Sequence, residues 1–167
     1  VCHNPESFKF MFHLALCLEK NGQKDEALTI YRDIIQKFPE DSRVYRNMGV
    51  HFEERGDYEL ALVCFKKMLD LGGEKSLGAS SIANCYLKLG DLPMAAQYCE
   101  RAVSSGEQLA ESWILFARVF LSKGDKDGAR VAYRQALAEE PRLFGVYNPY
   151  VALGGHSEEE LKSIVQR

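Results

Sequence analysis

GDYELALVCF, residues 56–65, has three counterparts in the chain, and together the four segments decide the fold. GQKDEALTIY begins at Gly22, GDLPMAAQYC at Gly90 and GDKDGARVAY at Gly124. Successive segments start 34 residues apart, so the chain is built from a repeat of that length. The Arg-Gly-Asp at residues 55–57, which resembles a cell-adhesion tripeptide, is therefore interpreted as a joint inside one repeat.

The agreement between the four copies extends beyond this joint. Counting Phe8 as position 1, position 20 is always alanine, position 8 is always small and position 7 is always bulky. In that order the residues are Ala27, Ala61, Ala95 and Ala129; Ala15, Gly49, Ala83 and Ala117; and Leu14, Met48, Ile82 and Phe116. Small residues at matched places let two helices approach closely, and bulky ones fill the space between them. The pattern predicts helices packed in pairs.

Aromatic residues and prolines recur in the same phase, with Tyr45 and Trp113 at position 4 and Pro39 and Pro141 at position 32. With the period, this set resembles the tetratricopeptide repeat. The resemblance covers residues 8–141 and implies an all-α, right-handed α-solenoid of four antiparallel helix pairs. The four repeats are 8–41, 42–75, 76–109 and 110–141.

The resemblance also predicts the two ends and the helices. Residues 1–7 form an N-terminal extension, and residues 142–167 form capping helices, because a terminal repeat must cover apolar surface that no further repeat covers. Helix A of each repeat is expected at 8–21, 42–55, 76–89 and 110–123, and helix B at 24–38, 58–71, 92–105 and 126–139.

The joint between helix A and helix B has its own chemistry. The glycine supplies a left-handed helix end, and Asp57, Asp91 and Asp125 are expected to cap the following helix by accepting its free N–H groups. The third repeat is entered through LGGEKSLG, residues 71–78, whose three glycines predict the weakest joint of the chain.

Composition excludes several classes of protein. The net charge is −3, whereas nucleic-acid binders usually carry a basic face, so no nucleic acid is expected as a partner. No run of 18 apolar residues predicts a membrane span. Five cysteines show no C-x-x-C and no cluster with histidine, which favours reduced thiols, a cytoplasmic location and no metal site.

Nothing in the sequence indicates an enzyme. The four histidines do not converge, and no Walker A, G-x-G-x-x-G or G-x-S-x-G motif is present. His51 is interpreted as a partly buried, hydrogen-bonded ring. We therefore expect no catalytic residue and no cofactor, and a protein or peptide as the partner.

The groove of such a solenoid predicts where this partner binds. Helices A line the concave side, so positions 2, 5, 6, 9 and 12 of each repeat are expected to face it. The candidate binding residues are Lys9, His13, Arg43, Arg46 and Asn47 at a polar, basic end, and Leu77, Ser81, Asn84, Leu87, Ile114, Leu115, Arg118 and Leu121 at an apolar end. Ile114, Leu115 and Leu121 are predicted to form an exposed apolar floor.

Two narrower functions remain as alternatives. A co-chaperone of this family holds acidic C-termini with a clamp of Lys, Asn and Arg, but only Asn47 fits that pattern here. A type III secretion chaperone is similar in length, but this chain carries a fourth full repeat. We therefore expect a non-enzymatic interaction module, as part of a larger scaffold or assembly protein, with its partner and oligomeric state left open.

Overall fold

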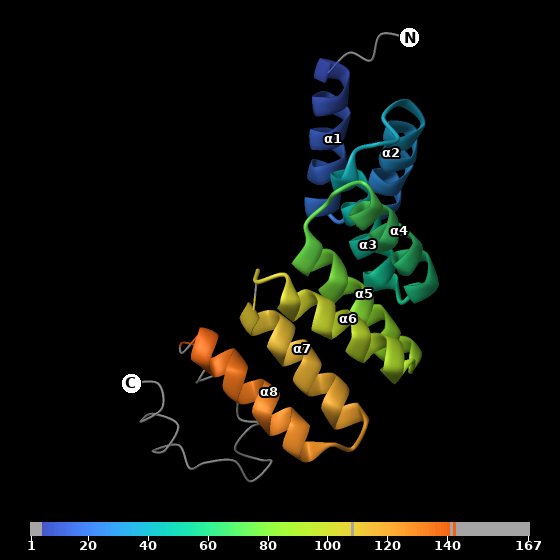
Figure 1. The fold of residues 1–167 in the computed structure, drawn as a ribbon. Coiled ribbons are helices and arrows are strands. Elements are labelled where there is room, and N and C mark those ends of the chain that lie inside the picture. Colours follow the sequence, from blue (N-terminus) through green and yellow to red (C-terminus); the bar gives the residue numbers. More distant parts are fainter. Residues whose placement is uncertain (1–4, 108, 141, 143–167) are drawn as a thin grey trace. The chain divides into compact units, whose positions relative to one another are not determined.

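The computed structural model describes residues 5–107, 109–140 and 142 (Figure 1). Eight α-helices and no strand occur among these residues. In chain order they are α1 (Pro5–Lys20), α2 (Lys24–Lys37), α3 (Ser42–Arg55), α4 (Tyr58–Asp70), α5 (Lys75–Leu89), α6 (Leu92–Ser104), α7 (Leu109–Ser122) and α8 (Lys126–Glu139). The predicted all-α architecture is confirmed.

The observed helix ends match the predicted ones to within one residue, except at the start of α1. That helix begins at Pro5, three residues before Phe8. Proline suits a first turn because its missing N–H has no partner there, and Glu6 is favourable at the positive end of the helix dipole. Residues 5–7, assigned above to an extension, are therefore helical. The predicted capping segment lies outside the described residues, apart from Arg142.

Two compact units divide the chain, Val1–Gly78 and Ala79–Arg167. The first contains α1 to α4 and the first residues of α5, and the second contains the rest of α5 with α6 to α8. The boundary falls at the end of LGGEKSLG, the stretch predicted to be the weakest joint.

A glycine with positive φ ends helix A at every joint. These glycines are Gly22 (80°), Gly56 (82°), Gly90 (82°) and Gly124 (78°). At the Arg-Gly-Asp, the Gly56 N–H donates to the carbonyl of Glu53 at 3.0 Å, and the Asp57 N–H donates to that of Phe52 at 2.9 Å. A side chain at Gly56 would be strained in this left-handed conformation. The tripeptide is thus a helix end, as predicted.

Two of the three predicted aspartate caps are confirmed. Asp91 Oδ1 accepts the Met94 N–H at 3.1 Å, and Asp125 Oδ1 accepts the Gly128 N–H at 2.8 Å. The prediction for Asp57 is wrong, because its side chain makes no capping hydrogen bond. Its Oδ2 lies 3.5 Å from Arg55 Nε instead, so the neighbouring guanidinium competes for the carboxylate.

In the first unit, small residues allow aromatic rings to enter between helices. Gly49 on α3 lies against the ring of Phe65 on α4, and a Cβ built on Gly49 would be 2.5 Å from Cε1 of that ring. The alanines Ala27 and Ala61 at position 20 are fully buried. These contacts confirm the helix pairing predicted from the repeat alanines and the small position 8.

In the second unit, the core consists of two clusters that share α7. The first contains Ala83, Ala95, Cys99, Leu115 and Val119, and the second contains Ala117, Ala132, Tyr133 and Leu137. Small residues make up three of the five members of the first cluster and two of the four members of the second, so the larger side chains fill spaces that their neighbours cannot fill. Burial raises the pKa of the Cys99 thiol to about 12, and the thiol is therefore neutral.

Candidate functional site

The described part of the chain offers no metal site of the usual kind. Among residues 5–107, 109–140 and 142, no group of three or more His, Cys, Asp or Glu side chains could hold a metal ion. None of the described helices combines the length and apolar character needed to cross a membrane.

His51 on α3 is more deeply buried than the sequence predicted. Its side chain is 2% exposed, and its ring lies edge-on to Phe52 with the centroids 5.7 Å apart. Within the described residues, Nε2 of His51 is buried without a hydrogen-bond partner, so the hydrogen bonding expected for this ring is not made at that atom. Burial, with a smaller effect from Arg55, lowers the pKa of His51, so the ring is neutral near pH 7.

Arg43, a candidate at the polar end, is held by its own unit. Its Nη2 donates to Asp41 Oδ2 at 2.6 Å and its Nε donates to Asp41 Oδ1 at 3.0 Å. The guanidinium also lies over the rings of Phe8 and Phe12, 5.0 and 5.3 Å from their centroids. A bidentate ion pair with aromatic contacts fixes Arg43, so little of its charge is left for a ligand.

The other cationic candidates of the first unit also have acidic neighbours. Lys9 Nζ is 3.4 Å from Glu6 Oε1, and Arg46 Nη1 is 3.5 Å from Glu74 Oε1. His13 Nδ1 lies 2.7 Å from the Lys9 carbonyl oxygen. Both ion pairs are exposed and therefore weak, but they reduce the positive field of this face.

Asn47, the residue that fits the family's carboxylate clamp, takes part in a buried network. Its Nδ2 donates to the Tyr31 hydroxyl at 3.0 Å. Tyr31 is fully buried, and it is also hydrogen-bonded to Glu19. Burial raises the pKa of the Glu19 carboxyl. Burial and the Glu19 charge raise the pKa of Tyr31. The Asn47 amide is thus engaged in holding a core tyrosine.

Leu115 does not form an exposed floor, and that prediction is wrong. Its side chain is 7% exposed and packs on α7 against Ala95 and Cys99 of α6. These two residues are small, so α6 leaves a space that Leu115 fills. Leu121 is only half-buried, although it packs against the α7–α8 cluster, and Ile114 is half-buried as well.

The second unit brings three of the predicted residues into one pocket. Leu87 on α5 and Arg118 and Leu121 on α7 line an open hollow of about 430 Å³. Lys88 and Ser122 complete its lining and were missed by the sequence analysis. Both occupy position 13, which directly follows position 12, one of the positions predicted to face the groove. The sequence could have indicated them if the next residue of the same helical turn had been included.

The remaining candidates lie outside this pocket. Leu77 is half-buried in the first unit, and Ser81 and Asn84 are half-buried on α5 in the second. None of these three lines the 430 Å³ hollow.

The cations of the pocket differ from those of the first unit. Lys88 and Arg118 are exposed, and within the described ranges neither has a carboxylate within ion-pair distance. The pocket therefore offers two cations, each next to a half-buried leucine, Leu87 or Leu121. This arrangement can receive a carboxylate together with an apolar side chain.

Curated relatives match different lengths of the chain. The TPR repeat-containing protein PA0015 of Pseudomonas aeruginosa is 33% identical over 73 residues, which are 44% of this chain and 70% of that protein. The anaphase-promoting complex subunit cut9 of Schizosaccharomyces pombe is 27% identical over 130 residues, 77% of this chain. The chain spans only 19% of the length of cut9.

Solved structures show the same fold at low sequence identity. MamA residues 41-end from Desulfovibrio magneticus RS-1 superpose with a TM-score of 0.80 and 16% identity, over 99% of this chain and 96% of that one. The first TPR of Spaghetti (RPAP3), bound to the HSP90 peptide SRMEEVD, gives a TM-score of 0.62 and 19% identity over 68% of this chain and 90% of that one.

Family models described as tetratricopeptide repeat match residues 10–41, 46–112 and 110–142. These matches, the PA0015 relative and the helix pairs that recur every 34 residues agree, and the chain belongs to the tetratricopeptide-repeat family with its all-α solenoid fold.

Proposed function

We propose that the chain is a non-enzymatic interaction module that binds an acidic peptide segment in the pocket of its second unit. The observation that carries the proposal is the pair of cations, Lys88 and Arg118, which have no acidic partner among the described residues and flank Leu87 and Leu121. The repeat fold itself supports a protein–protein interaction module.

The expected ligand has a carboxylate and an adjacent apolar side chain. Arg118 can donate two parallel hydrogen bonds to one carboxylate, and Lys88 can add a point charge from the neighbouring helix. The leucines are half-buried, so an apolar side chain that covers them removes more of their surface from water. An extended peptide with alternating acidic and apolar residues meets both requirements.

This mode differs from the carboxylate clamp of the family's co-chaperones. The clamp takes its cations and amides from helix A positions where this chain has Phe12, Leu77 and Ser81, and its one matching residue, Asn47, holds Tyr31. The acidic peptide bound to Spaghetti supports the ligand class alone. In this chain the charges come from positions 13 and 9 of successive repeats.

Charge reversal in the pocket tests the proposal. An array of acidic heptapeptides with one Leu or Phe, with SRMEEVD included, is screened by fluorescence polarisation, and the tightest binder is titrated against variants. Because a charge-assisted hydrogen bond contributes about 1.5–3 kcal/mol, Arg118→Glu and Lys88→Glu should each weaken binding at least about tenfold. The wild-type affinity should also fall as salt rises.

Arg134→Glu is the matched control, because Arg134 is an exposed cation of the second unit on α8, outside the pocket lining. It should leave the affinity within about twofold, since a charge that does not touch the ligand is screened by salt. Equal affinity in Arg118→Glu and the control would refute the pocket as the binding site. The leucines are poor test positions because both also pack against the core.

We also propose a cytoplasmic location. The four described cysteines, Cys17, Cys64, Cys85 and Cys99, are all free thiols, which suits a reducing compartment.

A further inference from the structure

The pocket of Lys88 and Arg118 lies at one end of the second unit, where the acids of the adjoining turns are already engaged. It is lined by the C-terminal ends of α5 and α7. Asp91 and Asp125 follow these two helices, but the side chain of each caps the helix that it precedes. The two cations are therefore left without a carboxylate among the described residues.

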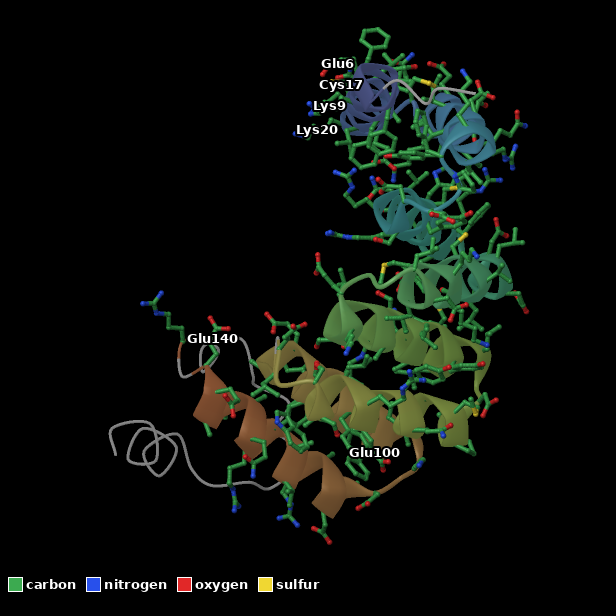
Figure 2. The ribbon with its side chains drawn as sticks, turned by 45° about the horizontal axis from the view of Figure 1, so that its top comes forward. Glu6, Lys9, Cys17, Lys20, Glu100 and Glu140 are labelled. Atoms are coloured by element: carbon green, nitrogen blue, oxygen red, sulfur yellow. The ribbon has the colours of Figure 1, made fainter. Side chains whose placement is uncertain are left out.

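Three more acids of this unit lie at the other end of α7. Glu111, Glu139 and Glu140 line another hollow, of about 340 Å³, where α7 begins and α8 ends. Figure 2 shows Glu140 at the end of α8 that is far from the turn after α7. The fold thus holds these three acids away from Arg118, and they cannot serve as its partners.

The sequence contains a segment that matches the ligand expected for the pocket. Residues 157–161 read SEEEL, and their three glutamates are the only acids among residues 141–167. Leu161 follows the glutamates directly. A carboxylate with an adjacent apolar side chain is what two cations beside two half-buried leucines can receive.

The chain between α8 and this segment is long enough to reach the pocket. Helix α8 begins four residues after Ser122, which lines the pocket, and its 14 residues rise about 20 Å. The stretch from Arg142 to Glu158 is about 16 residues and spans up to about 50 Å when extended. It can therefore return along α8 with more than half of its length to spare.

We propose that residues 157–161 of the same chain occupy the Lys88–Arg118 pocket, so that an acidic partner must displace an internal ligand. This inference rests on the proposed function. Arg118 pairs with one glutamate of the segment, and Lys88 pairs with another. Leu161 covers the leucines of the pocket and removes more of their surface from water.

The connection within one chain makes even a weak internal ligand effective. A tethered ligand acts at an effective concentration of about 1 mM, so a segment with a Kd of about 0.1 mM fills the pocket in about nine chains of ten. An external peptide then finds about one pocket in ten open, and its apparent affinity is about tenfold lower than that of the open pocket.

Fluorescence polarisation with a labelled peptide of residues 155–165, GHSEEELKSIV, measures this competition. The variant Glu158→Gln/Glu159→Gln/Glu160→Gln keeps the size of the three side chains and removes their charge. It should bind the peptide about tenfold more tightly than the wild-type chain does. Adding Arg118→Glu to this variant should weaken the binding at least about tenfold, because a charge-assisted hydrogen bond is lost.

Glu111→Gln/Glu139→Gln/Glu140→Gln is the matched control, because it removes three acids of the same unit from outside the pocket. It should leave the affinity within about twofold of the wild-type value. If acidic peptides bind in an Arg118-dependent way but both triple variants have equal affinities, the internal ligand is refuted. If no acidic peptide, the 155–165 peptide included, binds any of these proteins in that way, the pocket itself is refuted, so the two failures are distinguishable.

Zero-length cross-linking gives a covalent readout of the contact. A carbodiimide joins a lysine amine to a carboxylate in an amide bond, and it takes up the water and becomes a urea. Peptide mapping of the wild-type chain should find Lys88 joined to one of residues 158–160, in a yield that does not change on dilution. A bond found only between an isotope-labelled and an unlabelled chain would overturn the assignment within one chain. A map without any bond from Lys88 to this segment would contradict the contact itself.

Discussion

Replacing Leu115 with alanine tests the most informative difference between the sequence and the structure. The sequence placed this side chain on the floor of a groove, where truncation would cost little stability. The structure places it in the α5–α6–α7 core, 7% exposed, in one cluster with Ala95 and Cys99. The two views differ in the predicted free energy of unfolding of Leu115→Ala.

The size of the loss follows from the neighbours. A buried leucine replaced by alanine costs about 2–5 kcal/mol, and the cost rises with the cavity that remains. Ala83, Ala95 and Cys99 are themselves small and fully buried, and they are too short to move into the space. We therefore expect a loss in the upper half of the range, about 3–4 kcal/mol.

Urea unfolding followed by tryptophan fluorescence measures this loss directly. The single tryptophan, Trp113, is on α7 and packs against the α7–α8 cluster, so it reports on the second unit. Arg134→Ala is the control, because Arg134 on α8 is exposed and belongs to the same unit as Trp113. The control should change stability by less than about 0.5 kcal/mol. A loss below about 1 kcal/mol in Leu115→Ala would refute the core assignment.

Three further predictions concern other joints of the fold. Gly49→Ala should destabilise the first unit by about 1–3 kcal/mol in thermal unfolding, because its Cβ would overlap the rigid ring of Phe65; a stabilised variant would show that the ring can move. Burial lowers the pKa of His51. Below about pH 6.5 the unfolded chain therefore binds a proton at His51 that the folded chain does not bind, so the free energy of unfolding should decrease as the pH is lowered. His51→Val, which introduces the residue of repeat 4 at this position, should remove this pH dependence. Asp125→Ala should cost about 1 kcal/mol in chemical unfolding because a capping bond is lost, and Asp57→Ala should cost clearly less; equal losses would contradict the cap assignment.

The helices were predictable because their signals are local and repeated. Gly56 ends α3 in a conformation that few other residues adopt, and Ala61 must be small wherever two helices meet. Each such constraint recurs with the period, so one ambiguous copy is corrected by the others. The start of α1 lay outside the repeat and was therefore placed three residues late.

The exposure of single side chains was harder to predict, because it depends on the size of neighbours from other helices. Position 6 holds His13, Asn47 and Ser81, which indicated a polar groove position. Leu115 occupies the same position but is buried, since α6 presents Cys99 where the first and last repeats have tyrosine. A smaller residue on helix B leaves room for a larger one on helix A. The repeat pattern treats each position separately, so it does not predict that a change at one position alters the burial of a residue at another.

Charge pairing was missed for a related reason. The acids that pair with Arg43 and Arg46 are Asp41 and Glu74, which lie in the turns between repeats and not on the groove positions. A count of cations on helix A therefore overstated the positive field of the first unit.

Position 13 connects these observations to function. In the second repeat it is occupied by Glu54, which pairs with Lys24 of the preceding helix and so links α2 to α3. In the third repeat the same position holds Lys88, which has no acid within reach among the described residues and lines the pocket instead. The position is exposed in both cases, so the fold tolerates either charge, and an exposed substitution there changes stability little. Since the charge at Lys88 can be reversed without unfolding the helix, a loss of peptide binding in Lys88→Glu can be attributed to recognition, whereas the same loss in Leu115→Glu would follow from the collapse of the core.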